Sequence, residues 1–228
     1  MLGSARSVLM KPGAGPSFPA PIAAYALNEN TGTTSADASG NSHTLTLNTT
    51  SWTSSGHTGA GLTNTTATLG ASTALLAPTT TLTLMAWIQP LDLTSGTTHF
   101  ATGFLDSGGN TDVAIFNQRA DFGSSNVLQA NIRIGGTLIA LNGSALTVGV
   151  WAHIALTFDG TTAKLYKDAS QVASVTNAGV VSTGDAFYVA GWNTVSPYPT
   201  NLIIDDVRVF NTSLTQAQVS AAMSTPVT

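Results

Sequence analysis

Residues 151–175, with the sequence WAHIALTFDGTTAKLYKDASQVASV, restrict the fold of this chain more than any other segment. From residue 151 to residue 158 every second side chain is apolar, which is the period of a strand with one buried face. Asp159-Gly160 follows and supplies a tight turn, because both residue types tolerate the backbone angles that a hairpin needs. The chain then runs back and turns again. The segment therefore predicts three consecutive antiparallel strands, an arrangement typical of a β-sandwich.

Short β patterns of the same kind recur along the chain, separated by polar turn sequences. This organisation predicts an all-β fold, a two-sheet antiparallel jelly-roll sandwich over residues 22–228. One short helix is expected at residues 216–223, because Thr215 and Gln218 have the spacing of a capping box. Besides the segment above, strands are expected at residues 22–27, 45–47, 61–69, 82–88, 99–104, 113–117, 127–134, 138–141, 186–192 and 202–210.

Residues 1–21 form a separate Pro/Gly-rich segment. The sequence KPGAGPSFPAP at residues 11–21 disfavours helix and central strand, since proline removes a backbone donor and restricts φ. One interpretation is a disordered leader or linker. The other, which we favour, is an N-terminal arm that docks on a neighbouring subunit.

Composition excludes several classes of function. Charged residues make up 8% of the chain, against roughly 25% in ordinary domains. A net charge of −4 with seven Lys and Arg argues against nucleic-acid binding, which needs clustered positive charge. The absence of cysteine excludes disulfides, a thiolate nucleophile and Cys-ligated zinc. No apolar run reaches about 20 residues, so membrane insertion is not expected, and the N-terminus lacks the apolar segment of a secretory signal.

Five segments in order along the chain resemble the laminin-G-like, concanavalin A-like jelly-roll family. The resemblance implies the sandwich fold but leaves function open, since members act as glycan-binding modules, adhesion domains, enzyme accessory domains and phage structural proteins. Ala169 departs from the pattern, because the family usually has a turn glycine there. The segments are residues 24–41 with the sequence ADASGN at 36–41, residues 82–90 (LTLMAWIQP), residues 151–167, residues 204–210 (IDDVRVF) and residues 211–219 (NTSLTQAQV).

The resemblance further implies a structural calcium ion, which some members hold near the opening loop and the last strand. Calcium binds several oxygen ligands. Asp205 shares strand parity with Val207 and Val209, so we expect its carboxylate to point inward, where a charge needs a partner. Arg208 has the opposite parity and should not supply one. The alternative is that the loop residues only cap turns. The candidate ligands are Asp37, Asn41, Asp205 and Glu29.

Carbohydrate binding would need exposed aromatic side chains beside hydrogen-bonding groups. The loop of residues 191–199 (GWNTVSPYP) offers both, and Trp52 lies in another turn-rich stretch. Trp87 and Trp151 lie in predicted strands and are expected in the core. The alternative for the loop is that its tryptophan packs between the sheets. The candidate sugar-binding residues are Trp192, Asn193, Tyr198 and Trp52.

The chain is not expected to be an enzyme. Glycosidases use a pair of carboxyl groups around the scissile bond, whereas this chain has a single glutamate, Glu29. Asp205 and Asp206 should point to opposite faces of their strand. The four histidines are scattered singly, and no nucleophile elbow, P-loop or HExxH motif occurs.

These observations favour a non-catalytic structural or adhesive surface module. The leading hypothesis is a bacteriophage virion protein, either a capsid decoration protein or a minor tail protein. Its arm would bind other virion structural proteins, and the sandwich on the virion surface would contact host glycans. The alternative is a carbohydrate-binding module of a bacterial surface or secreted protein, and a glycoside-active enzyme is the third hypothesis. A homo-oligomer stays open, since sandwiches can join at their edges.

Overall fold

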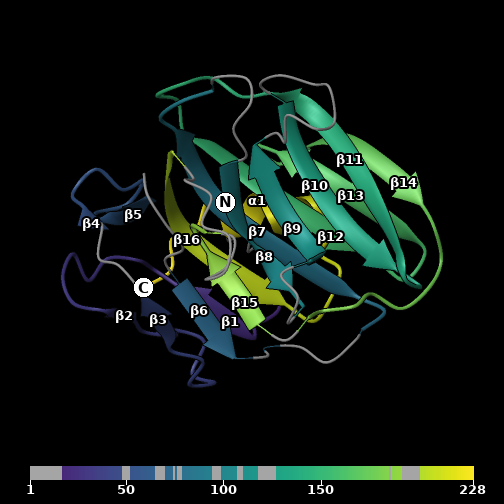
Figure 1. Ribbon diagram of the computed structural model, residues 1–228, viewed down its shortest axis with the longest axis horizontal. Coiled ribbons are helices and arrows are strands. Elements are labelled where there is room, and N and C mark those ends of the chain that lie inside the picture. The colour runs from purple at the N-terminus through teal and green to yellow at the C-terminus, as the bar shows by residue number, and fades with distance from the viewer. Residues whose placement is uncertain are drawn as a thin grey trace, which may run out of the picture.

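The computed structural model describes residues 17–47, 52–64, 70–73, 75, 79–93, 99–106, 110–117, 127–184, 186–191 and 201–228. Within these ranges the chain forms two antiparallel β-sheets packed face to face, with one helix against the outside of one sheet (Figure 1). The arrangement confirms the all-β jelly-roll sandwich expected from the sequence. None of the helical residues in the described ranges forms a segment long and apolar enough to cross a membrane.

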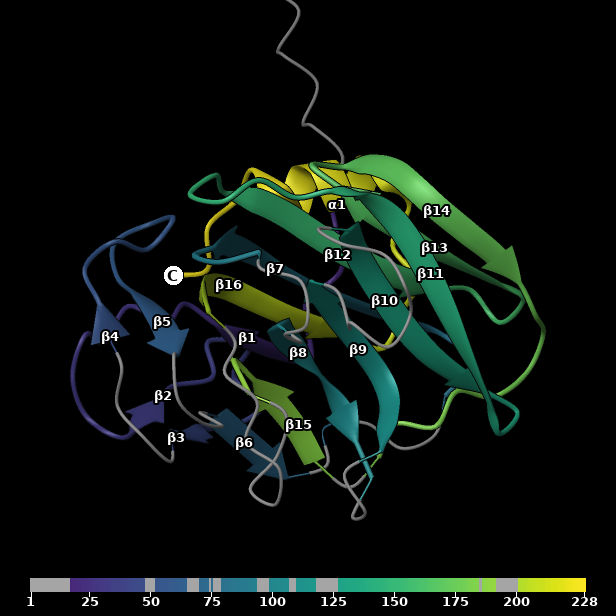
Figure 2. The same ribbon diagram turned by 45° about the horizontal axis from the view of Figure 1, so that its top comes forward.

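The first sheet, sheet A, contains the two longest central strands and carries the helix on its outer face (Figure 2). Its order is β14-β13-β12-β7-β16-β5-β4. Strand β1 also pairs with β16, at residues 207–209, whereas β5 pairs with residues 202–204 of the same strand. The strands are β1 (Ala23–Tyr25), β4 (Trp52–Thr53), β5 (Gly61–Asn64), β7 (Leu82–Pro90), β12 (Ala152–Phe158), β13 (Thr162–Lys167), β14 (Ser170–Thr176) and β16 (Leu202–Phe210).

The second sheet, sheet B, has the order β11-β10-β9-β8-β15-β6-β3-β2. It closes the other side of the sandwich, and its edge strand β11 lies against β13 and β14 of sheet A. The strands are β2 (Thr34–Ser35), β3 (Leu45–Leu47), β6 (Gly70–Thr73), β8 (His99–Leu105), β9 (Thr111–Asn117), β10 (Val127–Ile134), β11 (Thr137–Ala145) and β15 (Ala186–Val189).

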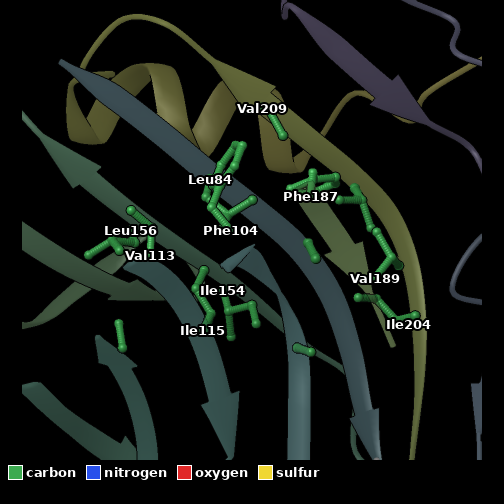
Figure 3. Packing of buried hydrophobic residues seen from close by; sticks show 14 of the residues in the cluster. Leu84, Phe104, Val113, Ile115, Ile154, Leu156, Phe187, Val189, Ile204 and Val209 are labelled. Atoms are coloured by element: carbon green, nitrogen blue, oxygen red, sulfur yellow. The ribbon is translucent and has the colours of Figure 1, made fainter. Parts of the chain in front are cut away.

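The hydrophobic core lies between the sheets and is built from alternate residues of both (Figure 3). Leu84 of β7 and Leu156 of β12 are opposite each other in sheet A, and both are fully buried. From sheet B, the Phe104 and Phe187 rings pack with centroids 5.0 Å apart. Burying a side chain of this size contributes roughly 1.5–3 kcal/mol. The alternation read from residues 151–158 therefore supplies one wall of the core.

The two turns of residues 151–175 use different chemistry. At the first, Oδ1 of Asp159 accepts hydrogen bonds from the amides of Thr161 and Thr162, and Gly160 has a φ of 97°. At the second, Asp168 and Ala169 both have positive φ, at 50° and 60°. Such angles cost an L-residue roughly 1–2 kcal/mol. Ala169 thus adopts the left-handed conformation that a turn glycine takes more easily.

Helix α1 (Gln216–Met223) occupies the predicted residues and begins with the predicted capping box of Thr215 and Gln218. Val219 and Ala222 are buried against a second apolar cluster on the outer face of sheet A, which contains Met85 of β7. The helix is therefore held mainly by packing on the sheet, as expected for so short an element.

Several boundaries differ from the expected ones. The short strands β2, β4 and β6 were not predicted, because two to four residues show too little alternation to be recognised. Strand β11 runs through residue 145 instead of ending at residue 141. Residues 1–16 of the arm lie outside the described residues, so its docking role stays a prediction. From its end, Phe18 packs edge-on against Phe210, with centroids 6.3 Å apart.

Candidate functional site

A β-bulge in β16 decides which way its acidic residues point. Across β7, Asp205 lies opposite Trp87 and Arg208 lies opposite Met85, so β16 has one extra residue between the two pairs. Asp206 takes a left-handed conformation there, with a φ of 50°. Opposite residues in a sheet share a face, so Asp205 and Arg208 both face outward with Trp87 and Met85.

The bulge corrects two expectations from the sequence. The prediction that Asp205 points into the core was wrong, because parity counted from Val207 does not continue across the extra residue. The prediction that Asp205 and Asp206 point to opposite faces was also wrong. Asp206 forms an ion pair with the outward Arg208, with 3.0 Å between Nη2 and Oδ1, and lines a pocket with Trp87.

Asp205 attaches the loop of residues 54–60, between β4 and β5, to the outer face of sheet A. Its Oδ2 accepts a hydrogen bond of 2.8 Å from the amide of Thr58, and its Oδ1 accepts one from the amide of Asp206. The side chain is almost completely buried. Burial raises the pKa of Asp205 to about 6, although the hydrogen bonds to its carboxylate oppose this rise.

The attached loop brings His57 onto the sheet. The imidazole lies flat on the indole of Trp87, with ring centroids 3.6 Å apart and 11° between the planes. Trp151 contacts His57 edge-on, with ring centroids 5.6 Å apart. The buried His153 contacts Trp87 edge-on, with centroids 5.3 Å apart. Burial against these rings lowers the pKa of His57. Three aromatic rings from separate parts of the chain thus form an outward-facing cluster, which we call the aromatic cluster: His57, Trp87 and Trp151.

Sequence reasoning placed these tryptophans wrongly. Trp87 and Trp151 are half-buried on the outer face and do not belong to the core, although both were expected there. The signal that could have found them is strand parity. In β7 the core residues are Leu84, Ala86 and Ile88, so Trp87 must face the other way. The contribution of His57 could not have been found, since it depends on a loop contact.

A pocket of about 280 Å³ opens beside the aromatic cluster. His57, Thr58 and Trp87 line it, and the nearly buried Asp206 also belongs to its lining. The lining is completed by Met223 at the end of helix α1 and by Ser224 and Pro226 after it. The pocket thus combines aromatic surface with a few polar groups, the usual composition of a small-molecule site.

Arg208 holds the wall of this pocket in place. Its Nη1 donates to the carbonyl of Ala222 at 2.7 Å, and its Nη2 donates to the carbonyl of Thr225. Asp206 accepts a hydrogen bond of 2.9 Å from the amide of Val227. Burial raises the pKa of Asp206 and outweighs the lowering by Arg208. The ion pair of the bulge therefore ties the C-terminal segment to β16.

The four residues expected to bind calcium stabilise loops. Both oxygens of Asp37 are occupied: they accept hydrogen bonds from the amides of Ala24, Ser39 and His43 and from the hydroxyl of Ser39. Burial alone would raise the pKa of Asp37, but these bonds together lower it. Asn41 donates to the carbonyl of Ile22 at 3.0 Å.

The remaining two candidate ligands are also engaged elsewhere. Glu29 accepts a hydrogen bond of 2.8 Å from the amide of Ala36, and Asp205 holds the loop at Thr58. Within the described ranges, His, Asp and Glu residues do not gather into any group of three that could hold a metal ion. Each of the four candidate ligands thus has a hydrogen-bonding role in a loop or at the sheet, and calcium binding by Asp37, Asn41, Asp205 and Glu29 stays a prediction.

Three of the four predicted sugar-binding residues, Trp192, Asn193 and Tyr198, lie outside the described residues. The fourth, Trp52, is half-buried and packs against the core cluster. Its Nε1 donates to the carbonyl of Gly32 at 3.0 Å. These contacts give Trp52 a structural role at the edge of sheet A.

Solved structures share this fold at low sequence identity. Domain 4 of AbnA, a GH43 extracellular arabinanase from Geobacillus stearothermophilus solved in complex with arabinotriose, is 23% identical with a TM-score of 0.62; the match covers 89% of this chain and 97% of that one. The binding domain of Paraclostridial Mosquitocidal Protein 1 is 13% identical with a TM-score of 0.65, over 88% of this chain and 51% of that one. The Botulinum neurotoxin serotype D binding domain is 13% identical with a TM-score of 0.66, and the match covers 89% of this chain and 50% of that one.

The chain thus spans about half of each toxin domain and nearly all of the arabinanase domain. No curated protein matches the sequence significantly. The sequence profile of one family, described as the concanavalin A-like lectin/glucanases superfamily, matches residues 62–220, which is more than half of the chain. The chain therefore belongs to the concanavalin A-like lectin/glucanases superfamily.

Proposed function

We propose that this protein is a non-catalytic carbohydrate-binding module, and that the pocket beside the aromatic cluster receives the sugar. The observation that carries the proposal is the gathering of His57, Trp87 and Trp151 on the outside of the sandwich, next to the Asp206 carboxylate. Aromatic rings offer apolar surface to the C–H face of a sugar, and the polar lining residues Thr58 and Ser224 are of types that hydrogen-bond to its hydroxyls.

The comparisons support this class of ligand without identifying it. One structure of the same fold was solved in complex with arabinotriose, and two others are described as binding domains. Their sequence identities of 13–23% support a shared fold only. Carbohydrates are therefore the first class of ligand to test on this chain.

The state of the carboxylates favours binding over hydrolysis. A glycosidase needs two carboxyl groups that touch the substrate. Both carboxylate oxygens of Asp205 accept hydrogen bonds from backbone amides, and Asp206 forms an ion pair with Arg208. The single glutamate, Glu29, accepts a hydrogen bond from a loop amide. These carboxylates already have structural partners, which supports a module that binds without catalysis.

A glycan array followed by calorimetry tests the proposal. We expect His57→Ala and Trp151→Ala each to weaken binding about tenfold or more, the effect of losing about 1.4 kcal/mol of contact. Leu138→Ala is the matched control, because Leu138 is an exposed apolar residue of β11 in sheet B. Circular dichroism checks that each variant folds.

The same measurement separates this pocket from the loop predicted from the sequence. If Trp192→Ala or Tyr198→Ala abolishes binding while His57→Ala and Trp151→Ala leave it unchanged, the sugar binds at residues 191–199 and the proposed pocket is wrong. Binding to no glycan at all would reject the carbohydrate-binding function.

The virion surface is the proposed location of the module, with the bacterial cell surface or extracellular space as the alternative. The support comes from the low content of charge and from the Pro/Gly-rich segment at residues 1–21. Deletion of residues 1–20 should abolish incorporation into particles while leaving the sandwich folded, as measured by mass spectrometry of purified particles. Undiminished incorporation would reject the anchoring role.

A further inference from the structure

A second pocket adjoins the aromatic one at the loop of residues 54–60. It has a volume of about 480 Å³, and Thr58 lines both pockets. Each volume is near the lower part of the roughly 300–1,000 Å³ range of small-molecule sites. The other residues that line the second pocket are Asn28, Asn30, Ser54, Gly59 and Ala60.

Three hydrogen bonds fix the shared loop, two to other parts of the chain and one within the loop itself. The amide of Thr58 donates to Asp205, and the amide of Ala60 donates to Oδ1 of Asn28 at 2.8 Å. Within the loop, the amide of Gly56 donates to the carbonyl of Gly59 at 3.1 Å. A loop attached in this way forms a wall that exists before a ligand arrives, which reduces the entropy lost on binding.

The two pockets differ in chemistry. The first offers the His57–Trp87 stack, whereas the second offers the amide side chains of Asn28 and Asn30 and the hydroxyl of Ser54. Amides and hydroxyls are neutral groups that both donate and accept hydrogen bonds, as the hydroxyls of a sugar do.

The linings of the two pockets are suited to a ligand without charge. Among the described residues, neither lining contains Lys or Arg, and Asp206 of the first pocket is already paired with Arg208. Arg208 is committed to Asp206 and to two backbone carbonyls. Glu29 lies in the chain between two residues of the second pocket. A carboxylate on a ligand would therefore find no free cationic partner among the described lining residues.

We propose that the two pockets together bind a neutral oligosaccharide of at least two sugar units, with one unit beside the aromatic cluster and the next against Asn28, Asn30 and Ser54. The inference rests on the proposed carbohydrate-binding function and names its ligand class. Thr58 is the point where the chain of sugar units passes from one pocket to the other. Acidic sugars, such as uronates and sialosides, are disfavoured at both.

Calorimetry with glycans of increasing length tests the two-pocket site. The probes are neutral mono- to tetrasaccharides, arabinose to arabinotetraose and glucose to cellotetraose among them, and oligogalacturonates of the same lengths. We expect the affinity to rise about tenfold or more from one to two or three neutral units, and to be lower for the acidic series. Equal affinity for the monosaccharide and trisaccharide, or tighter binding of the acidic series, overturns this inference while the proposed function stands. Failure of every glycan to bind rejects both.

Variants of the second pocket sharpen the test. Asn30→Gly removes the carboxamide but keeps the positive φ of 52° that this position adopts, and Ser54→Ala removes the hydroxyl. Both should lower the affinity for a trisaccharide toward that of the monosaccharide, and should weaken trisaccharide binding more than monosaccharide binding. Asn211→Ala, at an exposed position outside both linings, is the control. Ser54→Lys should improve the affinity for acidic trisaccharides relative to neutral ones, and no such improvement would reject the role of charge.

Discussion

Asp205 and His153 are both buried on the outer face of sheet A, and burial favours the uncharged form of each. For Asp205 burial raises the pKa to about 6, from an ordinary value of 3.8. For His153 burial lowers the pKa to about 3, from 6.5, and the charges of Arg208 and His57 lower it further. In these uncharged forms the carboxyl group of Asp205 carries a proton, whereas the imidazole of His153 lacks the second proton that would charge it.

These shifts have opposite effects on the pH dependence of stability. Asp205 has a raised pKa in the folded state, so its stabilisation is fully present below 3.8 and is lost as pH rises through about 6. His153 has a lowered pKa, so its contribution is present above 6.5 and is lost as pH falls toward 3. Between these limits the two contributions partly cancel.

Single variants should reveal each contribution. We expect Asp205→Asn to make the free energy of unfolding fall more steeply on acidification from about pH 6.5 to 4, because the effect of His153 is no longer opposed. His153→Phe should reverse that slope and leave Asp205 dominant. Urea unfolding at a series of pH values measures both, and the double variant should show neither slope. Wild-type pH profiles in both single variants would contradict these assignments.

At the scale of the element, the bulge of β16 does more than interrupt a strand. It turns Asp206 toward Arg208, and this pair holds the last turn of helix α1 and the segment after it, through Ala222, Thr225 and Val227. One extra residue in a central strand thereby builds one wall of the candidate site. Without the extra residue, β16 could still pair with β7, but Asp205 and Asp206 would not both lie at the candidate site.

Replacing the buried arginine tests this role. Arg208→Met leaves Asp206 as an unpaired buried carboxylate and removes the donors to the helix end, so it should lower the free energy of unfolding by about 3–5 kcal/mol. Lys167→Met is the matched control, because Lys167 makes a single exposed hydrogen bond to the carbonyl of Ala145, and its loss should cost less than about 1 kcal/mol. Guanidinium denaturation compares the two. Similar losses in both variants would show that the pair does not organise the C-terminal segment.

At the scale of the whole molecule, the opening loop is closed by its own hydrogen bonds. The carboxylate of Asp37 binds amides before and after it in the sequence, and Asn41 joins the same loop to β1 through Ile22. These hydrogen bonds tie the loop to the segment at the start of β1. This arrangement bears directly on the calcium ion implied by the family resemblance.

We expect the thermal midpoint to be the same in EDTA and in calcium chloride. A bound ion at 100 times its Kd would add about 2.7 kcal/mol, and about 2–4 °C accompany each kcal/mol in a chain of this size. Differential scanning calorimetry would therefore detect calcium as a rise of about 5–10 °C. Such a rise would restore the calcium site predicted from the sequence, and magnesium chloride controls for ionic strength.

Much of the fold was predictable because its signals are local. Strands β10 and β16 have the bounds expected from their apolar patterns, and helix α1 was located from two polar residues at its start. The short strands β2, β4 and β6 were missed, since pairing with neighbours creates them rather than any pattern of their own. The candidate site was mostly missed for a similar reason.

The sequence alone determined the sandwich, its alternating core and the capped helix, because alternation and capping act between residues only a few positions apart. Only the tertiary structure decided where Asp205 and Asp206 point, since a bulge is defined by the partner strand β7. It also decided that His57 lies on Trp87, because Asp205 reaches Thr58 from a strand that is distant in the chain. Contacts between remote segments carry no periodic signal, and in this protein they build the site.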